Sequence, residues 1–269
     1  MTWIDIGVNL TDKSFAGDRD QVMARARDRG VEAMVLTGTS VSGSRAAAEL
    51  AAEHPDFLFS TAGVHPHDAK SCDQTTMAEL RSLASLPQVV AIGECGLDFN
   101  RNLSPPDVQR AQFEAQLELA AELSLPVFVH ERDAGEAMLE LLGRHRSQLG
   151  AVVVHCFTGN EKTLRGYLEL DLYIGITGWI CDERRGLHLR ELIPLIPSNR
   201  LMLETDAPYL LPRTIRPRPK SRRNEPAYIT HVADTVAAAL GIPVAELAKR
   251  TTGTAREFFG IPVQAGKSS

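Results

Sequence analysis

Four residues that can bind a divalent metal ion each follow or close a short apolar stretch of the chain. Glu94 follows VVAIG, His130 follows PVFV, His155 follows AVVV, and Asp206 closes LMLETD. Unbroken aliphatic and β-branched stretches of this length are typical of strands that are buried on both faces. Because parallel strands end at one edge of their sheet, we expect these imidazoles and carboxylates to meet there and form a divalent-metal site. The carboxyl ends of parallel strands are also where a barrel enzyme carries out its chemistry.

Eight strand-like stretches alternate with helical patterns along the 269 residues. We expect strands at Trp3–Val8, Ala33–Thr37, Phe57–Ala62, Val89–Gly93, Val127–Val129, Ala151–Val154, Leu172–Ile176 and Leu201–Glu204. The clearest helical pattern is Pro106–Leu123, where apolar residues fall on one face. This alternation predicts an α/β fold, a single-domain (β/α)8 TIM barrel over residues 1–262, with a tail over residues 263–269. A doubly wound open sheet is the alternative.

The composition restricts where and on what the protein acts. With 43% hydrophobic and 23% charged residues the chain is an ordinary globular protein, and no apolar stretch of about 18 residues predicts a membrane span. Four cysteines without C-x-x-C spacing, and an amino terminus without a basic signal region, predict a cytoplasmic protein. The net charge of −5 argues against tight, non-specific binding of duplex DNA. We expect a monomer.

Each candidate ligand also has a structural explanation. Glu94 could be a loop acid bonded to nearby amides, and a single histidine at the end of a strand is more often a core residue than a ligand. Two histidines on neighbouring strands favour a shared cation, because such strands lie only about 4.8 Å apart. Asp206 could cap a helix, but Pro208 and Pro212 disfavour a helix there. We therefore assign catalytic roles to Glu94 and Asp206, with Asp206 orienting or deprotonating the attacking water.

Other residues suit a nucleic-acid substrate. His65 and His67 follow the third expected strand, and we expect His65 to contact phosphate or support the metal ligands, with surface exposure as the alternative. The stretch Pro212–Arg223 contains six basic residues and no acid, and its prolines keep it extended. In a barrel this stretch lies on the catalytic face, so it could guide the substrate or be a solvated surface. Trp179 and Tyr209 could stack a base or belong to the packing.

Seven motifs occur together over nearly the whole chain. They are DIGVNL (Asp5–Leu10), TAGVHPH (Thr61–His67), AIGECGLDFNRN (Ala91–Asn102), HCFTG (His155–Gly159), GITGW (Gly175–Trp179), ETDAPYL (Glu204–Leu210) and RRNEP (Arg222–Pro226). This set resembles the TatD family of metal-dependent deoxyribonucleases, which implies a barrel of the wider amidohydrolase-like type. The resemblance implies a Mg²⁺-dependent 3′–5′ exonuclease that acts on single-stranded DNA, with RNA as a further substrate, in DNA repair or nucleic-acid turnover.

The resemblance also implies roles for particular residues. The family's metal ligands correspond to Glu94, His130, His155 and Asp206. Phosphate oxygens would be held by His65, Arg223 and Asn224. Most family members end the first strand with His-x-His, where this chain has Gly7 and Asn9. An amide oxygen is a weak ligand that suits Mg²⁺ better than Zn²⁺, so we expect one firmly bound cation and a second that arrives only with substrate phosphate.

Two other functions fit part of this pattern. A small-molecule metal hydrolase, such as a lactonase or an amidase, can use the same barrel and ligands. The basic stretch, and the absence of a lysine at the end of a strand, favour a phosphate substrate instead. A non-catalytic binding protein would explain the missing histidines at Gly7 and Asn9, but the four retained ligands disfavour it.

Overall fold

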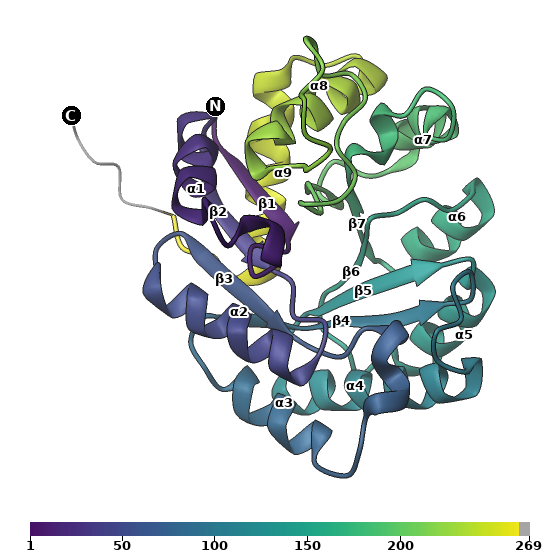
Figure 1. The fold of residues 1–269 in the computed structure, drawn as a ribbon. Helices are drawn as coiled ribbons and strands as arrows, with labels where there is room; N and C mark the ends of the chain where they lie inside the picture. Colours follow the sequence, from purple (N-terminus) through teal and green to yellow (C-terminus); the bar gives the residue numbers. More distant parts are fainter. Residues whose placement is uncertain (264–269) are drawn as a thin grey trace.

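A single sheet of eight parallel strands forms the centre of the protein. The computed structural model describes residues 1–263, and its strands pair in the order β1 to β8 (Figure 1). Val8 and Ala207 form a parallel bridge that joins β1 to the segment after β8, and the Asn9 N–H donates to the Ala207 carbonyl at 2.7 Å. This nearly closed barrel confirms the predicted fold, and the open-sheet alternative is wrong.

The strands and helices alternate as the sequence predicted. The strands are β1 Trp3–Val8, β2 Val31–Leu36, β3 Leu58–Ala62, β4 Val89–Asp98, β5 Val127–Arg132, β6 Val152–His155, β7 Tyr173–Ile176 and β8 Leu201–Leu203. The α-helices are α1 Arg19–Asp28, α2 Val41–Glu53, α3 Thr76–Ala84, α4 Pro106–Leu123, α5 Gly135–His145, α6 Glu161–Glu169, α7 Leu187–Leu192, α8 Ile229–Leu240 and α9 Val244–Phe259. Short 3-10 helices η1 Lys13–Phe15, η2 Pro66–Ser71, η3 Gly178–Cys181, η4 Ile193–Leu195 and η5 Pro226–Tyr228 lie in the connecting segments.

Two apolar layers hold the barrel together. The larger one lies between the strands and the surrounding helices, and the smaller one fills the barrel with side chains such as Ile6, Val35 and Phe128. Phe258 and Phe259, at the end of α9, belong to the smaller layer. Phe258 also packs edge-on against the ring of the first residue of β7, at 5.0 Å between centroids. The amino-terminal end of the barrel is therefore closed by apolar packing, and the opposite end is left for polar chemistry.

Two strands run further than the sequence pattern indicated. β4 extends to Asp98 and β5 to Arg132, whereas the expected strands ended at Gly93 and Val129. Polar residues and glycine interrupt the apolar pattern beyond those points, which hid the continuation. Glu94 consequently lies inside a strand rather than directly after one.

The last described residue is exposed, and no single described helix could span a membrane. Of the expected tail, Val263 is 72% exposed, and residues 264–269 lie outside the described part. No single helix in residues 1–263 has the length and apolar character to cross a membrane. One pair, Pro226–Leu240 with Val244–Phe259, meets that test only jointly and is bent by 108°.

Candidate metal centre

Glu94 lies in β4 between two glycines whose backbone conformation is rare for other residues. Gly93 and Gly96 have φ angles of 138° and 139°. A Cβ at Gly93 would collide with the Phe128 carbonyl oxygen, and a Cβ at Gly96 would collide with that of His130. The register between β4 and β5 shifts directly after Gly93, as in a β-bulge. The two glycines thus allow β4 to lie close against β5 while Glu94 faces the histidines.

One carboxylate oxygen of Glu94 lies among three imidazole rings. Glu94 Oε1 is 2.7 Å from His155 Nε2, 3.0 Å from His130 Nδ1 and 3.4 Å from His65 Nε2. The donor atoms of His65, Glu94 and His130 all lie within 4.8 Å of one another. Imidazole nitrogens around a carboxylate oxygen are a donor set that divalent cations use, so the residues present fit the implied metal. His65, expected at the phosphate, is thus part of the innermost group.

The charges of this group also suit a cation. Burial alone would raise the pKa of Glu94, but the neighbouring His155 and His65 hold that pKa well below its usual value. Burial would lower the pKa of His155, yet the carboxylates of Glu94 and Glu204 raise it well above its usual value. Glu94 is therefore an anion at any working pH. A proton on His155 competes with metal for the ring, so metal binding releases it.

Glu204 supports His155 from behind. The carboxylate is fully buried, and its Oε2 lies 3.2 Å from His155 Nδ1 while Oε1 accepts a hydrogen bond from the Cys156 N–H at 2.5 Å. A carboxylate that accepts the Nδ1 proton leaves the Nε2 lone pair of the ring facing Glu94. Both carboxylate oxygens of Glu204 therefore have a partner on β6 or directly after it, and Glu204 acts on the site through His155.

Asp206 is held at the edge of the group by the first strand. Its N–H donates to the Gly7 carbonyl at 2.9 Å, and its Oδ1 accepts from the Asn9 side-chain amide at 3.2 Å. The pKa of Asp206 is raised to about 7, mainly by burial and also by the nearby carboxylates of Glu94 and Glu204, while His155 opposes the rise. Because His155 and Glu94 both affect the pKa of Asp206, this carboxyl group lies within electrostatic reach of the histidine cluster. Asn9 orients the carboxylate of Asp206 with its amide nitrogen.

Asp98 was missed by the sequence reasoning. It is buried at the end of β4, and its Oδ2 lies 2.7 Å from His67 Nε2 and 3.5 Å from His130 Nε2. Although burial would raise the pKa of Asp98, hydrogen bonds from His130, a backbone N–H and His67 lower it. His130 Nε2 is buried with no closer partner in residues 1–263. Asp98 therefore lies behind His130 as Glu204 lies behind His155. Its place four residues after Glu94 was the available signal.

Arg223 is not directed at a phosphate in this structure. Its guanidinium donates to both carboxylate oxygens of Asp18 at 2.7 Å and to Glu225 at 2.9 Å. Those bonds, with Asp18 first, raise the pKa of Arg223. The ion pairs tie the end of the basic stretch to α1, so this predicted phosphate contact has its charge neutralised by two acids of the chain itself.

Asn224 is bonded to the backbone of its own loop. The residue is fully buried, its amide donates to the Thr205 carbonyl at 2.9 Å, and its Oδ1 accepts from the Glu225 N–H at 2.9 Å. Both bonds fix the loop that follows β8, and in this structure they occupy the amide that was expected to hold a phosphate. The phosphate contact of Asn224 stays a prediction.

The cysteines beside the ligands are unsuited to nucleophilic catalysis. Burial raises the pKa of both Cys95 and Cys156, and nearby anions raise it further. A thiol that stays protonated is a poor nucleophile. Metal-assisted attack by water is the chemistry that this arrangement supports.

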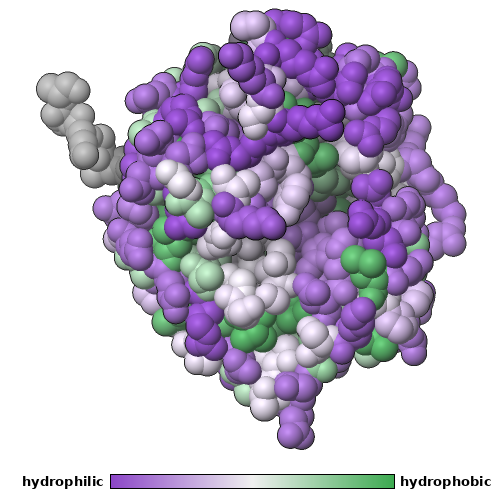
Figure 2. All heavy atoms as spheres, in the orientation of Figure 1, coloured by the Kyte–Doolittle hydropathy of each residue, from purple (hydrophilic) through white to green (hydrophobic). Residues whose placement is uncertain are grey.

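The surface around the site is polar. Figure 2 shows hydrophilic residues around a recess near the middle of the face turned to the viewer, and in the same view of Figure 1 the arrowheads of β1 and β3 point toward that region.

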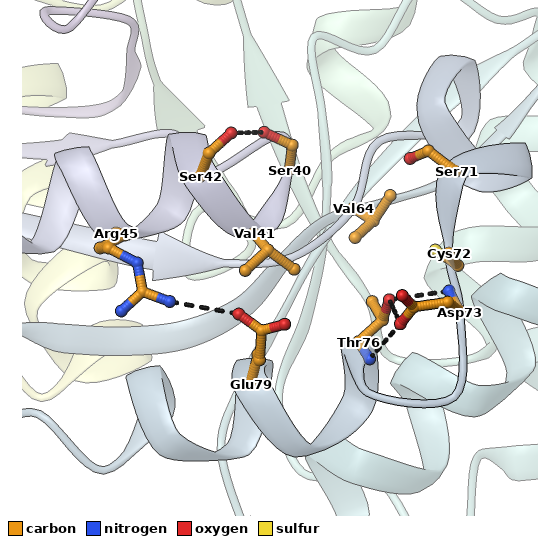
Figure 3. A pocket seen from close by; sticks show the side chains of 10 residues that line it. All are labelled: Ser40, Val41, Ser42, Arg45, Val64, Ser71, Cys72, Asp73, Thr76 and Glu79. Carbon is orange, nitrogen blue, oxygen red and sulfur yellow. Dashed lines mark hydrogen bonds and ion pairs between the residues drawn. The ribbon is translucent and has the colours of Figure 1, made fainter.

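A separate cavity of about 370 Å³ lies between α2 and α3, beside Val64, the residue before His65 (Figure 3). Arg45 pairs there with Glu79 at 3.2 Å, and Asp73 adds a second carboxylate. With two anions against one cation, this cavity is poorly suited to phosphate.

Comparison with known proteins agrees with the geometry of the centre. The family model described as TatD related DNase matches residues 4–260. The chain belongs to the TatD family. A relative from Erwinia tasmaniensis named 3′-5′ ssDNA/RNA exonuclease TatD is 57% identical over 257 residues, which are 96% of this chain and 99% of the relative. A relative of the same name from Klebsiella pneumoniae is 54% identical over 96% of this chain and 98% of its own. The predicted family is confirmed.

Solved structures agree with the same assignment. A TatD family hydrolase from Entamoeba histolytica superposes with a TM-score of 0.88 at 26% identity, covering 97% of this TatD-family chain and 99% of the other. The TatD homologue YJJV from Escherichia coli gives a TM-score of 0.87 at 26% identity, covering 97% and 98%. The barrel is therefore shared almost from end to end.

Proposed function

We propose that this protein is a Mg²⁺-dependent 3′–5′ exonuclease that hydrolyses single-stranded DNA and also RNA. The observation that carries the proposal is the convergence of three imidazoles on one oxygen of Glu94 at 2.7 to 3.4 Å. The relatives named 3′-5′ ssDNA/RNA exonuclease TatD, at 53–57% identity over nearly the full length, support the substrate and the polarity. A trimming activity of this kind fits DNA repair or nucleic-acid turnover.

The metal would be held by Glu94, His130, His155 and Asp206, with His65 adjacent. A bound divalent cation supplies charge neutralisation for the phosphate and a lower pKa for water. The donor set does not separate Mg²⁺ from other cations by itself. Asn9 stands where a histidine would add a nitrogen ligand and donates instead to Asp206, which favours a metal that accepts oxygen ligands. We propose one firmly bound cation, with a second that arrives with the substrate.

The chain's own residues have distinct tasks. Asp206 has one oxygen bonded to Asn9 and the other without a hydrogen-bond partner in residues 1–263, so the second oxygen can accept the proton of the attacking water. His65 is buried beside Glu94, and its Nδ1 accepts the His67 N–H at 3.1 Å, which directs Nε2 toward the centre. His65 can thus hold either the cation or a phosphate oxygen next to it.

Digestion of a 5′-labelled single-stranded oligonucleotide tests the proposal. With Mg²⁺ we expect a ladder of products that shorten from the 3′ end, and no products with excess chelator. Ribonucleotide and duplex versions of the same sequence report the substrate preference. Hydrolysis of lactones or amides with no shortening of any oligonucleotide would support the small-molecule alternative and reject the nuclease. Bound metal without turnover of either class would support a non-catalytic protein.

The cellular location and the oligomeric state of the protein are further parts of the proposal. All four cysteines are free, which fits the reducing cytoplasm. We propose a cytoplasmic monomer, and measurement of its mass in solution tests the second part.

A further inference from the structure

Arg132 is a cation at the mouth of the barrel that forms no ion pair with any acid of the described residues, 1–263. It ends β5 two residues after His130, and no carboxylate in residues 1–263 pairs with its guanidinium. Two of the six basic side chains in the stretch Pro212–Arg223 are paired, because Arg213 lies 2.8 Å from Glu183 and Arg223 lies 2.7 Å from Asp18, and the other four are exposed. A partly buried guanidinium without an anion is the better candidate for binding one.

The direction of Arg132 follows from its neighbours on the strand. Glu131 points to the helix layer, because its Oε2 accepts from the Tyr167 hydroxyl at 3.2 Å and its Oε1 accepts from the Ala134 N–H at 2.7 Å. Side chains alternate along a strand, so His130 and Arg132 both point to the opposite side, toward the barrel's mouth. Two residues of strand advance about 6.6 Å, which places Arg132 outside the metal centre but next to it.

Trp179 holds this guanidinium in place. The Arg132 Cζ lies 5.1 Å from the centroid of the Trp179 ring, and Trp179 lies in η3, the segment that follows β7, two strands along from β5. Arg185 also approaches this ring, at 4.4 Å, but it already pairs with Asp182 at 3.1 Å. The ring thus serves as a platform for arginine rather than for a base, and stacking leaves the N–H edge of Arg132 available.

We propose that Arg132, positioned by Trp179, binds the phosphate that lies one nucleotide to the 5′ side of the scissile phosphate. This assignment rests on the proposed exonuclease function. At a 3′ end the strand continues only in the 5′ direction, so a second phosphate near the metal centre can lie only on that side. Binding there would distinguish an oligonucleotide from a small diester and would hold the strand in place after each cleavage.

A neutral phosphate analogue tests this subsite without altering the protein. A 5′-labelled oligonucleotide carries a methylphosphonate either at the second phosphate from the 3′ end or, as a control, at the sixth. Removal of the first nucleotide is followed with enzyme in excess. With the wild-type protein, the analogue at the second position should raise the half-saturating enzyme concentration about tenfold to a hundredfold, the size expected for a charge-assisted hydrogen bond. The maximal rate should change little.

Substitutions then assign the effect to a residue. With the natural strand, Arg132→Gln should already show the raised half-saturating enzyme concentration. The methylphosphonate at the second phosphate should then cause no further rise. The salt dependence of the variant's binding should weaken by about 0.7 in logarithmic slope. Trp179→Leu should lose part of the sensitivity to the methylphosphonate at the second phosphate, and Trp179→Phe should retain more of that sensitivity. Arg144→Gln, on an exposed arginine in the last turn of α5 at the other end of the barrel, is the matched control and should behave as wild type.

Two results would overturn the subsite. One is a wild-type protein that cleaves both methylphosphonate strands equally well, and the other is an Arg132→Gln variant that keeps the wild-type sensitivity. Absence of shortening of any strand by the wild-type protein is a different result, because it rejects the exonuclease itself.

Discussion

Replacing Glu204 with glutamine tests whether a buried carboxylate prepares His155 to bind metal. Glutamine keeps the volume of the side chain but has one acceptor oxygen in place of two. If that oxygen stays with the Cys156 N–H, the new amide group faces His155 Nδ1, which must then accept. The ring proton moves to Nε2, the nitrogen that lies 2.7 Å from Glu94. In the other orientation the Cys156 N–H loses its acceptor, at a cost of about 1–3 kcal/mol.

The size of the effect follows from this geometry. Either orientation removes the negative charge behind the ring; the first reverses the hydrogen bond with His155, and the second loses the one from the Cys156 N–H. Loss of such a supporting partner commonly weakens metal binding about tenfold to a hundredfold, which corresponds to about 1.4–2.8 kcal/mol. Calorimetric titration of the metal-free protein with Mg²⁺ and with Mn²⁺ measures the loss directly. The Mg²⁺ concentration for half-maximal cleavage should rise by a similar factor.

Glu131→Gln is the matched control. Glu131 is also a buried glutamate beside a predicted ligand, but it faces the helix layer, where it accepts from the Ala134 N–H and the Tyr167 hydroxyl. A hydroxyl can rotate to accept instead, so glutamine satisfies both contacts. We expect near-normal metal affinity for this variant. If both variants lose affinity equally, or if Glu204→Gln binds metal as the wild type does, the reasoning about the His155 tautomer is refuted.

Three further outcomes are expected. Asp206→Ala should lower cleavage at least about a hundredfold while circular dichroism stays unchanged; near-normal rates would remove its catalytic role. Asp98→Asn should weaken metal binding about tenfold through His130, and an unchanged titration would show that Asp98 only shapes the loop. Burial raises the pKa of Asp5 from 3.8 to about 8, so folding favours the protonated acid and the unfolding free energy of the chelated protein should fall as pH rises through that range. Asp5→Asn should flatten this fall in urea denaturation, and equal slopes in the two proteins would contradict the assignment.

Much of the scaffold could be predicted because its signals are local. β1 and α4 have the bounds Trp3–Val8 and Pro106–Leu123 that the apolar pattern indicated. Parallel strands bring their carboxyl ends together, so Glu94, His130 and His155 could be placed in one group without coordinates. The structure confirms the barrel that this reasoning required.

The parts that sequence reasoning missed depend on contacts distant along the chain. Asp98 was hidden because β4 continues through Glu-Cys-Gly-Leu-Asp, where the apolar pattern stops. Arg223 looked like a free cation, yet its partner Asp18 is 205 positions away. Arg132 drew little attention beside the basic stretch, and its partly buried place at the end of β5, against the Trp179 ring and without an ion pair in residues 1–263, becomes visible only in the fold. A charge can be counted in a sequence, but whether that charge is neutralised depends on the fold.

The departure of β1 from the family's His-x-His pattern has a physical reason in the structure. A Cβ at Gly7 would collide with Glu204 Oε2 and would approach the Phe128 ring to 3.2 Å. Glu204 cannot withdraw easily, because its other oxygen holds the Cys156 N–H. A histidine at position 7 would therefore displace the carboxylate that orients His155. The chain has a glycine in place of a direct ligand on β1, and the space it leaves is filled by a carboxylate that orients a ligand on β6. With Asn9 donating to Asp206, β1 supports the centre without ligating it, which favours one firmly held cation.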